Sequence, residues 1–248
     1  MTLILTAAAP DAIVMGTDSA IALQLPGAPT QLVYSGLKKL FTWSPMGVGV
    51  SICGTFPTHV GKSSFSDWMQ GWYNANFGTK GIDPDEMAKL LCTHLDKYID
   101  KQFTSPVALH LAMWVTSVKF LGTKIPVIIE IKRAKDKYSY QGLLGADTIQ
   151  HIYNYRMDPK NPYVIVTFAS GLPNINKGTL ATLRDLFSSI VRSPVPAPSP
   201  LHLVEYVRTL ITTVAHLYAA AGLPNYVSLP VETLYLPSET LYGVSMRF

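Results

Sequence analysis

The sequence contains little cysteine and few charged residues. Its 248 residues include only two cysteines, Cys53 and Cys92, which cannot supply the disulfide framework of a small secreted domain. We therefore expect a reducing, cytoplasmic location. Charged residues make up only 15 % of the chain and the formal net charge is +4, which argues against a strongly basic protein that binds nucleic acid through its charge.

The sequence also lacks three patterns that define other classes of protein. Hydrophobic residues make up 48 % of the chain, but no uncharged apolar run reaches the ~18 residues that a membrane-spanning helix needs. The six histidines are scattered without metal-ligand spacing. Phe56 stands where a phosphate-binding loop ending in Gly61-Lys62-Ser63 needs glycine. We therefore expect no metal or other cofactor and no nucleic-acid or membrane partner, and we assign the apolar content to a large core and subunit contacts.

Blocks of strands and blocks of helices follow one another along the chain. The predicted strands are Leu3–Ala8, Ala12–Asp18, Ser19–Leu25, Thr30–Tyr34, Lys39–Trp43, Gly47–Cys53, Val107–Phe120, Ile125–Arg133, Lys137–Leu143, Tyr163–Ala169, Val227–Leu236 and Leu241–Phe248. The predicted helices are Thr58–Phe77, Asp83–Lys101, Asp147–Tyr155, Asn176–Val191 and Leu201–Ala221. The first six strands form three successive hairpins and predict an antiparallel sheet. Helices in pairs between antiparallel strands favour one α+β domain over residues 1–248, built as a four-layer α/β/β/α sandwich.

Thr2 is the first candidate for chemistry. A chain that begins Met-Thr usually loses its methionine, so we expect Thr2 to carry a free α-amine beside its hydroxyl, a complete arrangement for acyl transfer. We expect Thr2 to begin an edge strand, with Asp18 at the end of the next strand and Lys39 at the start of a later one. At a shared rim, the lysine would lower the pKa of the threonine hydroxyl and the aspartate would orient the lysine. An ordinary turn carboxylate and an ordinary strand-end lysine remain the alternative.

These residues resemble the start of a proteasome-type β-subunit. The motifs that carry the resemblance are Thr2 before an apolar strand, Val14-Met-Gly-Thr-Asp18-Ser19, Lys38-Lys39-Leu40-Phe41 and Gly49-Val-Ser-Ile-Cys53-Gly54-Thr55. Proteasome β-subunits and the bacterial HslV peptidase are N-terminal-nucleophile hydrolases with an α/β/β/α sandwich. The resemblance implies that Thr2 is the nucleophile, that its α-amine is the base, and that Asp18 and Lys39 support it. It also implies an oxyanion hole at the backbone N–H of Cys53 or Gly54.

The resemblance extends to a serine and to a substrate pocket. The segment from Tyr163 to Gly171 resembles a strand-to-helix turn that carries a serine near the nucleophile in the family, and Ser170 is the matching position. The residues expected to line the pocket are Ala22, Ser51, Cys53 and Gly54. The chain departs from the family after the last long helix, where His216–Gly222 lacks an Asp and a Ser that support the N-terminus.

The sequence therefore predicts a self-compartmentalising threonine endopeptidase. We expect a homo-oligomeric ring that cleaves peptides or unfolded proteins, with an ATP-dependent unfoldase as a candidate partner. Two alternatives stay open. One is a non-catalytic scaffold subunit of a ring, which the missing Asp and Ser favour. The other is an amidase or transpeptidase that uses the same nucleophile on a narrow substrate, in a pocket shaped by Ser51 and Cys53.

Overall fold

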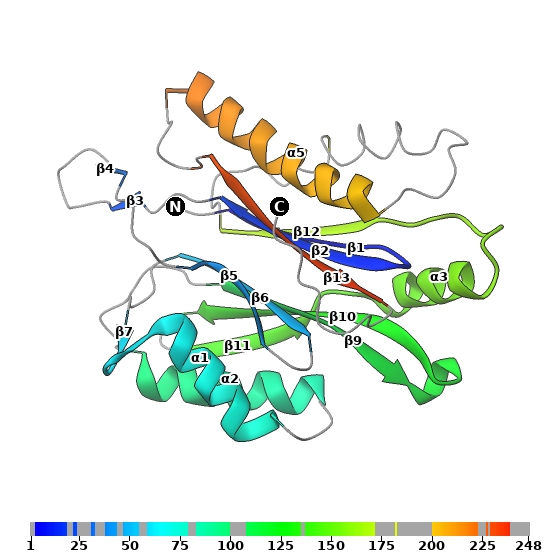
Figure 1. Ribbon diagram of the computed structural model, residues 1–248, viewed down its shortest axis with the longest axis horizontal. Coiled ribbons are helices and arrows are strands. Elements are labelled where there is room, and N and C mark those ends of the chain that lie inside the picture. Colours follow the sequence, from blue (N-terminus) through cyan, green and yellow to red (C-terminus); the bar gives the residue numbers. More distant parts are fainter. Residues whose placement is uncertain are drawn as a thin grey trace.

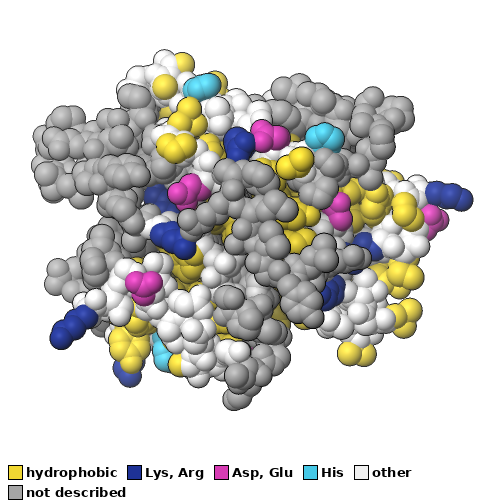
Figure 2. All heavy atoms as spheres, in the orientation of Figure 1, with side chains coloured by type: hydrophobic (Ala, Val, Ile, Leu, Met, Phe, Trp, Pro, Cys, Tyr) yellow, Lys and Arg dark blue, Asp and Glu magenta, His cyan; other side chains and the backbone are white. Residues whose placement is uncertain are grey.

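The computed structural model describes residues 3–18, 22–23, 31–32, 38–43, 47–54, 59–78, 83–99, 108–134, 137–171, 182, 200–222, 227 and 229–238. These residues form an α+β protein whose strands make two larger antiparallel sheets (Figure 1). Within this part of the chain, no helix is long and apolar enough to cross a membrane. On the face seen in Figure 2, the described cationic and anionic side chains are interspersed rather than gathered by sign.

The first sheet has four strands in the order β12-β1-β2-β13. They are β1 (Ile4–Ala8), β2 (Ala12–Asp18), β12 (Val166–Ser170) and β13 (Val231–Pro237). The expectation that the first strand lies at an edge is wrong, because β1 pairs with β2 on one side and with β12 on the other. Local turn signals reveal the β1–β2 hairpin, but they carry no information about a partner more than 150 residues away.

The second sheet has five strands in the order β11-β10-β9-β6-β5. They are β5 (Leu40–Trp43), β6 (Val48–Cys53), β9 (Ala108–Ser117), β10 (Thr123–Ala134) and β11 (Lys137–Gly142). The three predicted hairpins therefore do not share a sheet. The β1–β2 hairpin belongs to the first sheet and the β5–β6 hairpin to the second, while β3 (Ala22–Leu23) and β4 (Gln31–Leu32) form a ladder of their own.

The first sheet packs against α5 (Pro200–Ala220) through one of its faces. Alternate residues of β1, including Leu5 and Ala7, join a buried apolar cluster with α5. Gly16 of β2 allows the helix to approach closely, because a Cβ there would lie 2.5 Å from Val207 Cγ1 and 2.8 Å from Ile211 Cδ1.

The two sheets pack against each other through a second apolar cluster. Its fully or nearly buried members come from both sheets and are Ala8, Ile13, Met15, Leu40, Ala112, Ile128, Leu234 and Leu236. The remaining face of the five-stranded sheet is covered by α1 (Phe65–Phe77) and α2 (Pro84–Tyr98), as Figure 1 shows. Polar side chains on the facing sides of the two sheets are therefore sealed from water unless they lie near a rim.

The helix boundaries follow local capping chemistry. The predicted start of the first helix at Thr58 is wrong, because β7 (His59–Val60) and β8 (Ser63–Ser64) form a tight hairpin before it. Ser64 then caps α1 by accepting a hydrogen bond from the Asp67 N–H at 3.1 Å. Asp83 caps α2 as predicted, and its Oδ1 accepts from two backbone N–H groups.

Four further predicted elements differ in how they compare with the structure. The helix predicted over Asp147–Tyr155 is confirmed as α3 (Ala146–Met157). The strand predicted to reach Phe120 ends earlier, because Val118–Phe120 forms a short 3-10 helix. The predicted helix Asn176–Val191, apart from Thr182, and the predicted strand Leu241–Phe248 lie outside the described residues.

Candidate functional site

Asp18, at the end of β2, is fully buried and holds the start of β1. Its Oδ1 accepts a hydrogen bond from the Leu3 N–H at 2.8 Å. Its own N–H donates to the Leu3 carbonyl oxygen at 3.3 Å. Thr2 lies outside the described residues, but the Leu3 nitrogen belongs to the peptide bond that joins Leu3 to Thr2. The Asp18 carboxylate is therefore bound to the backbone next to the candidate nucleophile.

Lys39 lies at the start of a strand of the other sheet and contacts Asp18. It stands immediately before β5, and its Nζ donates to the backbone oxygen of Asp18 at 3.2 Å and lies 3.7 Å from Asp18 Oδ1. The Lys39 side chain is only 6 % exposed. Burial lowers the pKa of Lys39, and the charge of Asp18 opposes this effect. The structure thus brings Asp18 and Lys39 together as a buried pair of opposite charges.

Cys53 and Gly54 end β6 beside this pair. Cys53 is 2 % exposed and packs with Ile4 and Ala108. Burial raises the pKa of its thiol to about 12, so the thiol is protonated near neutral pH. Gly54 has φ of +98°, a left-handed conformation that favours glycine. We refer to Leu3, Asp18, Lys39 and Cys53 as the rim cluster.

The two other predicted pocket residues, Ser51 and Ala22, lie in different sheets. Ser51 of β6 is fully buried, and its Oγ has no hydrogen-bond partner among the described residues. It is paired in register with His110 of β9 on one side and with Leu40 of β5 on the other. Ala22 belongs to the separate β3–β4 ladder and is not part of either larger sheet.

Ser170 lies in a second group of polar residues, between the two sheets. It ends β12 and is paired in register with Ile4 of β1. Its Oγ donates a hydrogen bond to Glu130 Oε1 and lies 3.0 Å from His110 Nε2. The other ring nitrogen of His110, Nδ1, lies 2.8 Å from Thr6 Oγ1. We refer to Thr6, His110, Glu130 and Ser170 as the inter-sheet polar cluster.

Sequence reasoning missed His110 and Glu130. No sequence spacing predicts their contacts with Thr6 and Ser170, because these contacts join residues that are 40 to 104 positions apart. A usable signal was nevertheless present. Each is a polar residue with apolar residues on both sides, at an alternating position whose neighbours Leu109, Leu111, Ile129 and Ile131 all face the core beneath α1 and α2.

Charge is well compensated in the inter-sheet polar cluster. Burial alone would raise the pKa of Glu130, but its polar contacts with His110, Lys132, Ser170 and Gln141 outweigh burial and hold that pKa below its usual range. Lys132 Nζ and Gln141 Nε2 lie 2.7 and 2.8 Å from Glu130 Oε2. Burial lowers the pKa of His110 although Glu130 opposes it, so the imidazole is neutral near pH 7.

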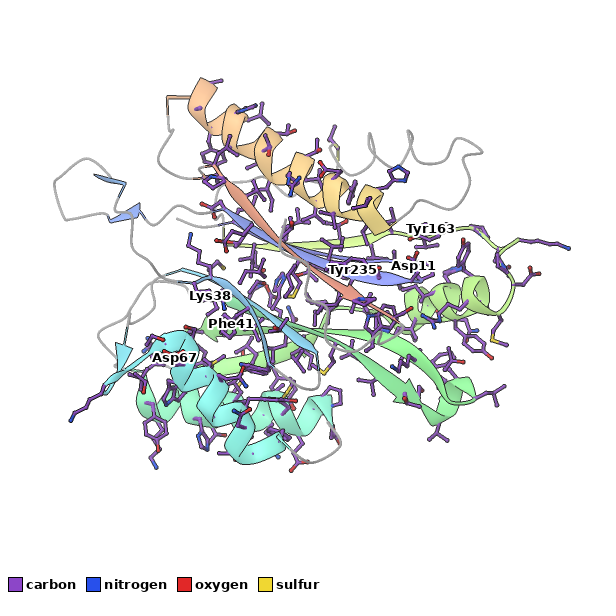
Figure 3. All side chains as sticks on the ribbon, viewed as in Figure 1. Asp11, Lys38, Phe41, Asp67, Tyr163 and Tyr235 are labelled. Atoms are coloured by element: carbon purple, nitrogen blue, oxygen red, sulfur yellow. The ribbon has the colours of Figure 1, made fainter. Side chains whose placement is uncertain are left out.

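The opposite end of the four-stranded sheet carries a different polar contact. Tyr163 OH donates to Asp11 Oδ1 at 2.6 Å, and Figure 3 shows this pair and Tyr235 at the far end of the sheet from Lys38. Burial and the Asp11 contact raise the pKa of Tyr163. This contact fixes the β1–β2 turn and is separate from the rim cluster.

Comparison with known proteins corrects the sequence-based family assignment. No family model and no curated protein matches the sequence. The fold is similar to that of an Anbu protein, a Gly-1 mutant from Hyphomicrobium sp. strain MC1, with a TM-score of 0.56. The match covers 100 % of this chain and 88 % of that chain at 10 % sequence identity.

A likeness at 10 % identity bears on the fold alone. The assignment of the chain to the proteasome β-subunit and HslV family therefore does not hold. The short motifs at Asp18, Lys39 and Gly54 mark strand ends and a left-handed turn, and such positions are set by the geometry of a fold. They are too few to define a family.

Proposed function

We propose that the protein is a threonine-type peptidase that uses Thr2 as an N-terminal nucleophile on the layered fold of the N-terminal-nucleophile hydrolases. One observation carries the proposal: the carboxylate of Asp18 binds the Leu3 N–H at 2.8 Å while Lys39 Nζ lies 3.7 Å from that same carboxylate. The pair also has a structural role, because it holds the start of β1 and connects the two sheets. Perturbed, buried charges of this kind are typical of functional sites.

The chemistry needs only groups of this chain and water. The Thr2 hydroxyl oxygen attacks a peptide carbonyl carbon, and its proton passes to the Thr2 α-amine. The positive charge of Lys39 lowers the pKa of the Thr2 hydroxyl and so assists this step. Backbone N–H groups at Cys53 or Gly54 stabilise the resulting oxyanion.

The intermediate then collapses in two stages. The carbon–nitrogen bond breaks, the leaving amine takes the proton from the α-ammonium, and an ester to Thr2 remains. Water, deprotonated by the α-amine, hydrolyses this ester and restores the hydroxyl. Asp18 acts by holding the Leu3 backbone and Lys39 in place throughout, so we regard it as a positioning residue.

Assembly and location form a further part of the proposal. We place the protein in the cytoplasm, because Cys53 and Cys92 are both buried free thiols. We propose a homo-oligomeric ring, and the exposed Val118 and Leu121 at the tip of the β9–β10 hairpin are candidates for a subunit contact. Light scattering on the wild type and on the double variant Val118→Asp, Leu121→Asp tests this point. A monomeric wild type would contradict the ring.

The nucleophile is tested by the intact mass of the protein before and after incubation with a peptide epoxyketone. This reagent closes a ring with both a hydroxyl and an α-amine on one residue. We expect the loss of Met1 and one adduct per chain, absent in Thr2→Ala. Thr93→Ala is the matched control, because Thr93 is an exposed threonine on α2 and its loss leaves the adduct unchanged.

The other outcomes of this experiment separate the two alternatives. Retained Met1 in protein matured by its native host removes the proposed base and favours a scaffold subunit. A free Thr2 that never reacts contradicts a general peptidase and favours an amidase or transpeptidase with a narrow substrate.

A further inference from the structure

Three tyrosines and one carboxylate surround the β1–β2 turn, at the end of the four-stranded sheet that lies away from the rim cluster (Figure 3). They are Asp11 in the turn, Tyr155 on α3, Tyr163 in the segment before β12 and Tyr235 on β13. We refer to these four residues as the tyrosine–aspartate cluster. The chemistry proposed for the rim uses none of them.

Tyr163 contacts two of the other members of the cluster. Its OH donates a hydrogen bond to Asp11 Oδ1 at 2.6 Å. Its ring meets the ring of Tyr155 almost at a right angle, with the centroids 5.0 Å apart and the planes at 85°. Tyr235 is paired in register with Val14 of β2. Burial, together with the charge of Asp11, raises the pKa of all three tyrosines, so they are neutral near pH 7 and Asp11 carries the charge of the cluster.

The Asp11 carboxylate has no cationic partner within the part of the chain that the structure describes. Arg156 approaches the same turn, but its Nη1 donates to the backbone oxygen of Pro10 at 2.8 Å and its guanidinium carbon lies 5.5 Å from the centroid of the Trp114 ring. A carboxylate can accept about four hydrogen bonds, and Tyr163 supplies one of them. The negative charge of Asp11 is therefore left for a ligand from outside these residues.

The three tyrosine rings add a second attraction for a cation. All three side chains are partly buried, and Tyr163 and Tyr235 pack against the apolar cluster beneath α5. The face of an aromatic ring carries partial negative charge and attracts a cation placed over it. Among the described residues, no lysine or arginine lies over any of these three rings. A carboxylate and aromatic rings without a cation are the groups with which proteins recognise ammonium ligands.

We propose that the tyrosine–aspartate cluster binds an alkylammonium group that keeps at least one N–H, as at the end of a lysine or dimethyl-lysine side chain or in a small free amine. Asp11 supplies the opposite charge and an oxygen that accepts the N–H. The tyrosine rings contact the methyl or methylene groups, which carry part of the positive charge. The cluster is separate from the rim cluster, so this inference does not rest on the proposed peptidase function.

Binding is measured by NMR on protein with ¹³C-labelled tyrosine, in which the rings of the cluster are assigned among the 13 tyrosines from single substitutions to Phe. The probe is Nα-acetyl-Nε-dimethyl-lysine amide, added at constant ionic strength. We expect saturable shifts of the Tyr155 and Tyr163 signals with a Kd of roughly 1 mM, because one carboxylate and a few ring faces give modest affinity. The trimethyl form has no N–H for Asp11 and should bind about fivefold more weakly.

Substitutions within the cluster test the role of each group. Asp11→Asn keeps an oxygen that can accept from Tyr163 but removes the charge, so the affinity should fall about tenfold. Tyr155→Leu should weaken binding about threefold, whereas Tyr155→Phe keeps the ring and should bind as the wild type does. Tyr98→Leu is the matched control, because Tyr98 is an exposed tyrosine on α2, outside the cluster.

The source of the ammonium group is distinguished by a second probe, dimethylethylammonium, which has no peptide part. Equal affinity for the two probes assigns the site to a small free amine, and tighter binding of the lysine derivative assigns it to a protein side chain.

The charge requirement is tested with the Nε-acetyl form of the lysine probe, which keeps the side-chain stem but has no charge. We expect it to cause no saturable shift. Equal binding of the acetyl and dimethyl forms overturns the inference, as do shifts of the wild type that never saturate. Unchanged affinity in both Asp11→Asn and Tyr155→Leu also overturns it. If Asp11→Asn does not fold, the difference between Tyr155→Leu and Tyr155→Phe decides.

Discussion

The rim cluster and the inter-sheet polar cluster both bury charge, but they treat it differently. In the inter-sheet polar cluster, the Glu130 carboxylate has close partners on both oxygens, and hydrogen bonds outweigh the effect of burial on its pKa. At the rim, Lys39 Nζ is 3.7 Å from the Asp18 carboxylate, and burial outweighs the charge of Asp18 in setting the pKa of Lys39. A charge with close hydrogen bonds on each of its oxygens fixes a structure, whereas a buried charge whose pKa is shifted mainly by desolvation is typical of groups that act on a reacting atom.

The largest effect is expected from Lys39→Ala, which removes the buried positive charge beside Asp18. The adduct rate should fall about a thousandfold, within the range for loss of a catalytic charge or acid–base group. Lys38→Ala is the control, because Lys38 is an exposed neighbour in the sequence and its loss should change the rate little (Figure 3). Equal rates in the two variants would show that the rim charge is not functional.

The Asp18→Asn variant separates the charge of Asp18 from its contact with the backbone. An amide oxygen still accepts the hydrogen bond from the Leu3 N–H, but the buried Lys39 loses its opposite charge, so the free energy of unfolding should fall less than in Asp18→Ala and the adduct rate should fall about a hundredfold. Asp18→Ala should lose the rate and, in addition, about 1–3 kcal/mol of unfolding free energy, because the Leu3 N–H loses its partner. Rates and urea unfolding measure the two effects. A full rate in Asp18→Asn would leave Asp18 with a backbone role only.

Two buried serines, Ser170 and Ser51, differ in their hydrogen bonds. Ser170→Ala should lower the free energy of unfolding by about 2 kcal/mol, because Glu130 Oε1 and His110 Nε2 each lose their hydrogen bond to the serine hydroxyl. Ser51→Ala removes a buried hydroxyl that has no partner among the described residues, and we expect at most about 0.5 kcal/mol of loss or a small gain. Urea unfolding of both variants tests this difference, and equal losses would contradict the assigned hydrogen bonds.

The smallest effect concerns pH. Because the pKa of His110 is lowered in the folded protein, the unfolded chain binds a proton more readily than the folded one below pH ~6.5. The free energy of unfolding should therefore decrease as pH falls below that value. His110→Gln should flatten this dependence, while His216→Gln, at an exposed position on α5, should not. An identical slope in both variants would contradict a neutral His110.

The local part of the fold was accessible from the sequence. An apolar run placed β2 over Ala12–Asp18, and the helix predicted to begin at Asp83 begins there in the structure, with Asp83 as its N-cap. The contact of Asp18 with Lys39 was predicted because both stand at strand ends, but it forms between the two packed sheets and not along one antiparallel sheet. The hairpin before α1 was missed because the predicted helix was extended back to Thr58, whereas the aromatic residues at helical spacing begin only at Phe65.

The long-range part was not accessible. Whether a hairpin joins the first or the second sheet depends on pairings such as β1 with β12, which no local pattern encodes. The contacts of His110 with Thr6 and with Ser170 cross between the two sheets. They depend on the packing of complete layers, so a single sequence could mark His110 only as a polar position between two apolar neighbours.

Mapping the epoxyketone adduct to a residue by tandem mass spectrometry identifies the nucleophile. If Thr2 is the nucleophile, the adduct lies on Thr2 and is joined through both its oxygen and its α-nitrogen. An adduct on Ser170 would move the nucleophile to the inter-sheet polar cluster. An adduct on Cys53 would assign the chemistry to a thiol, and either result would contradict the account.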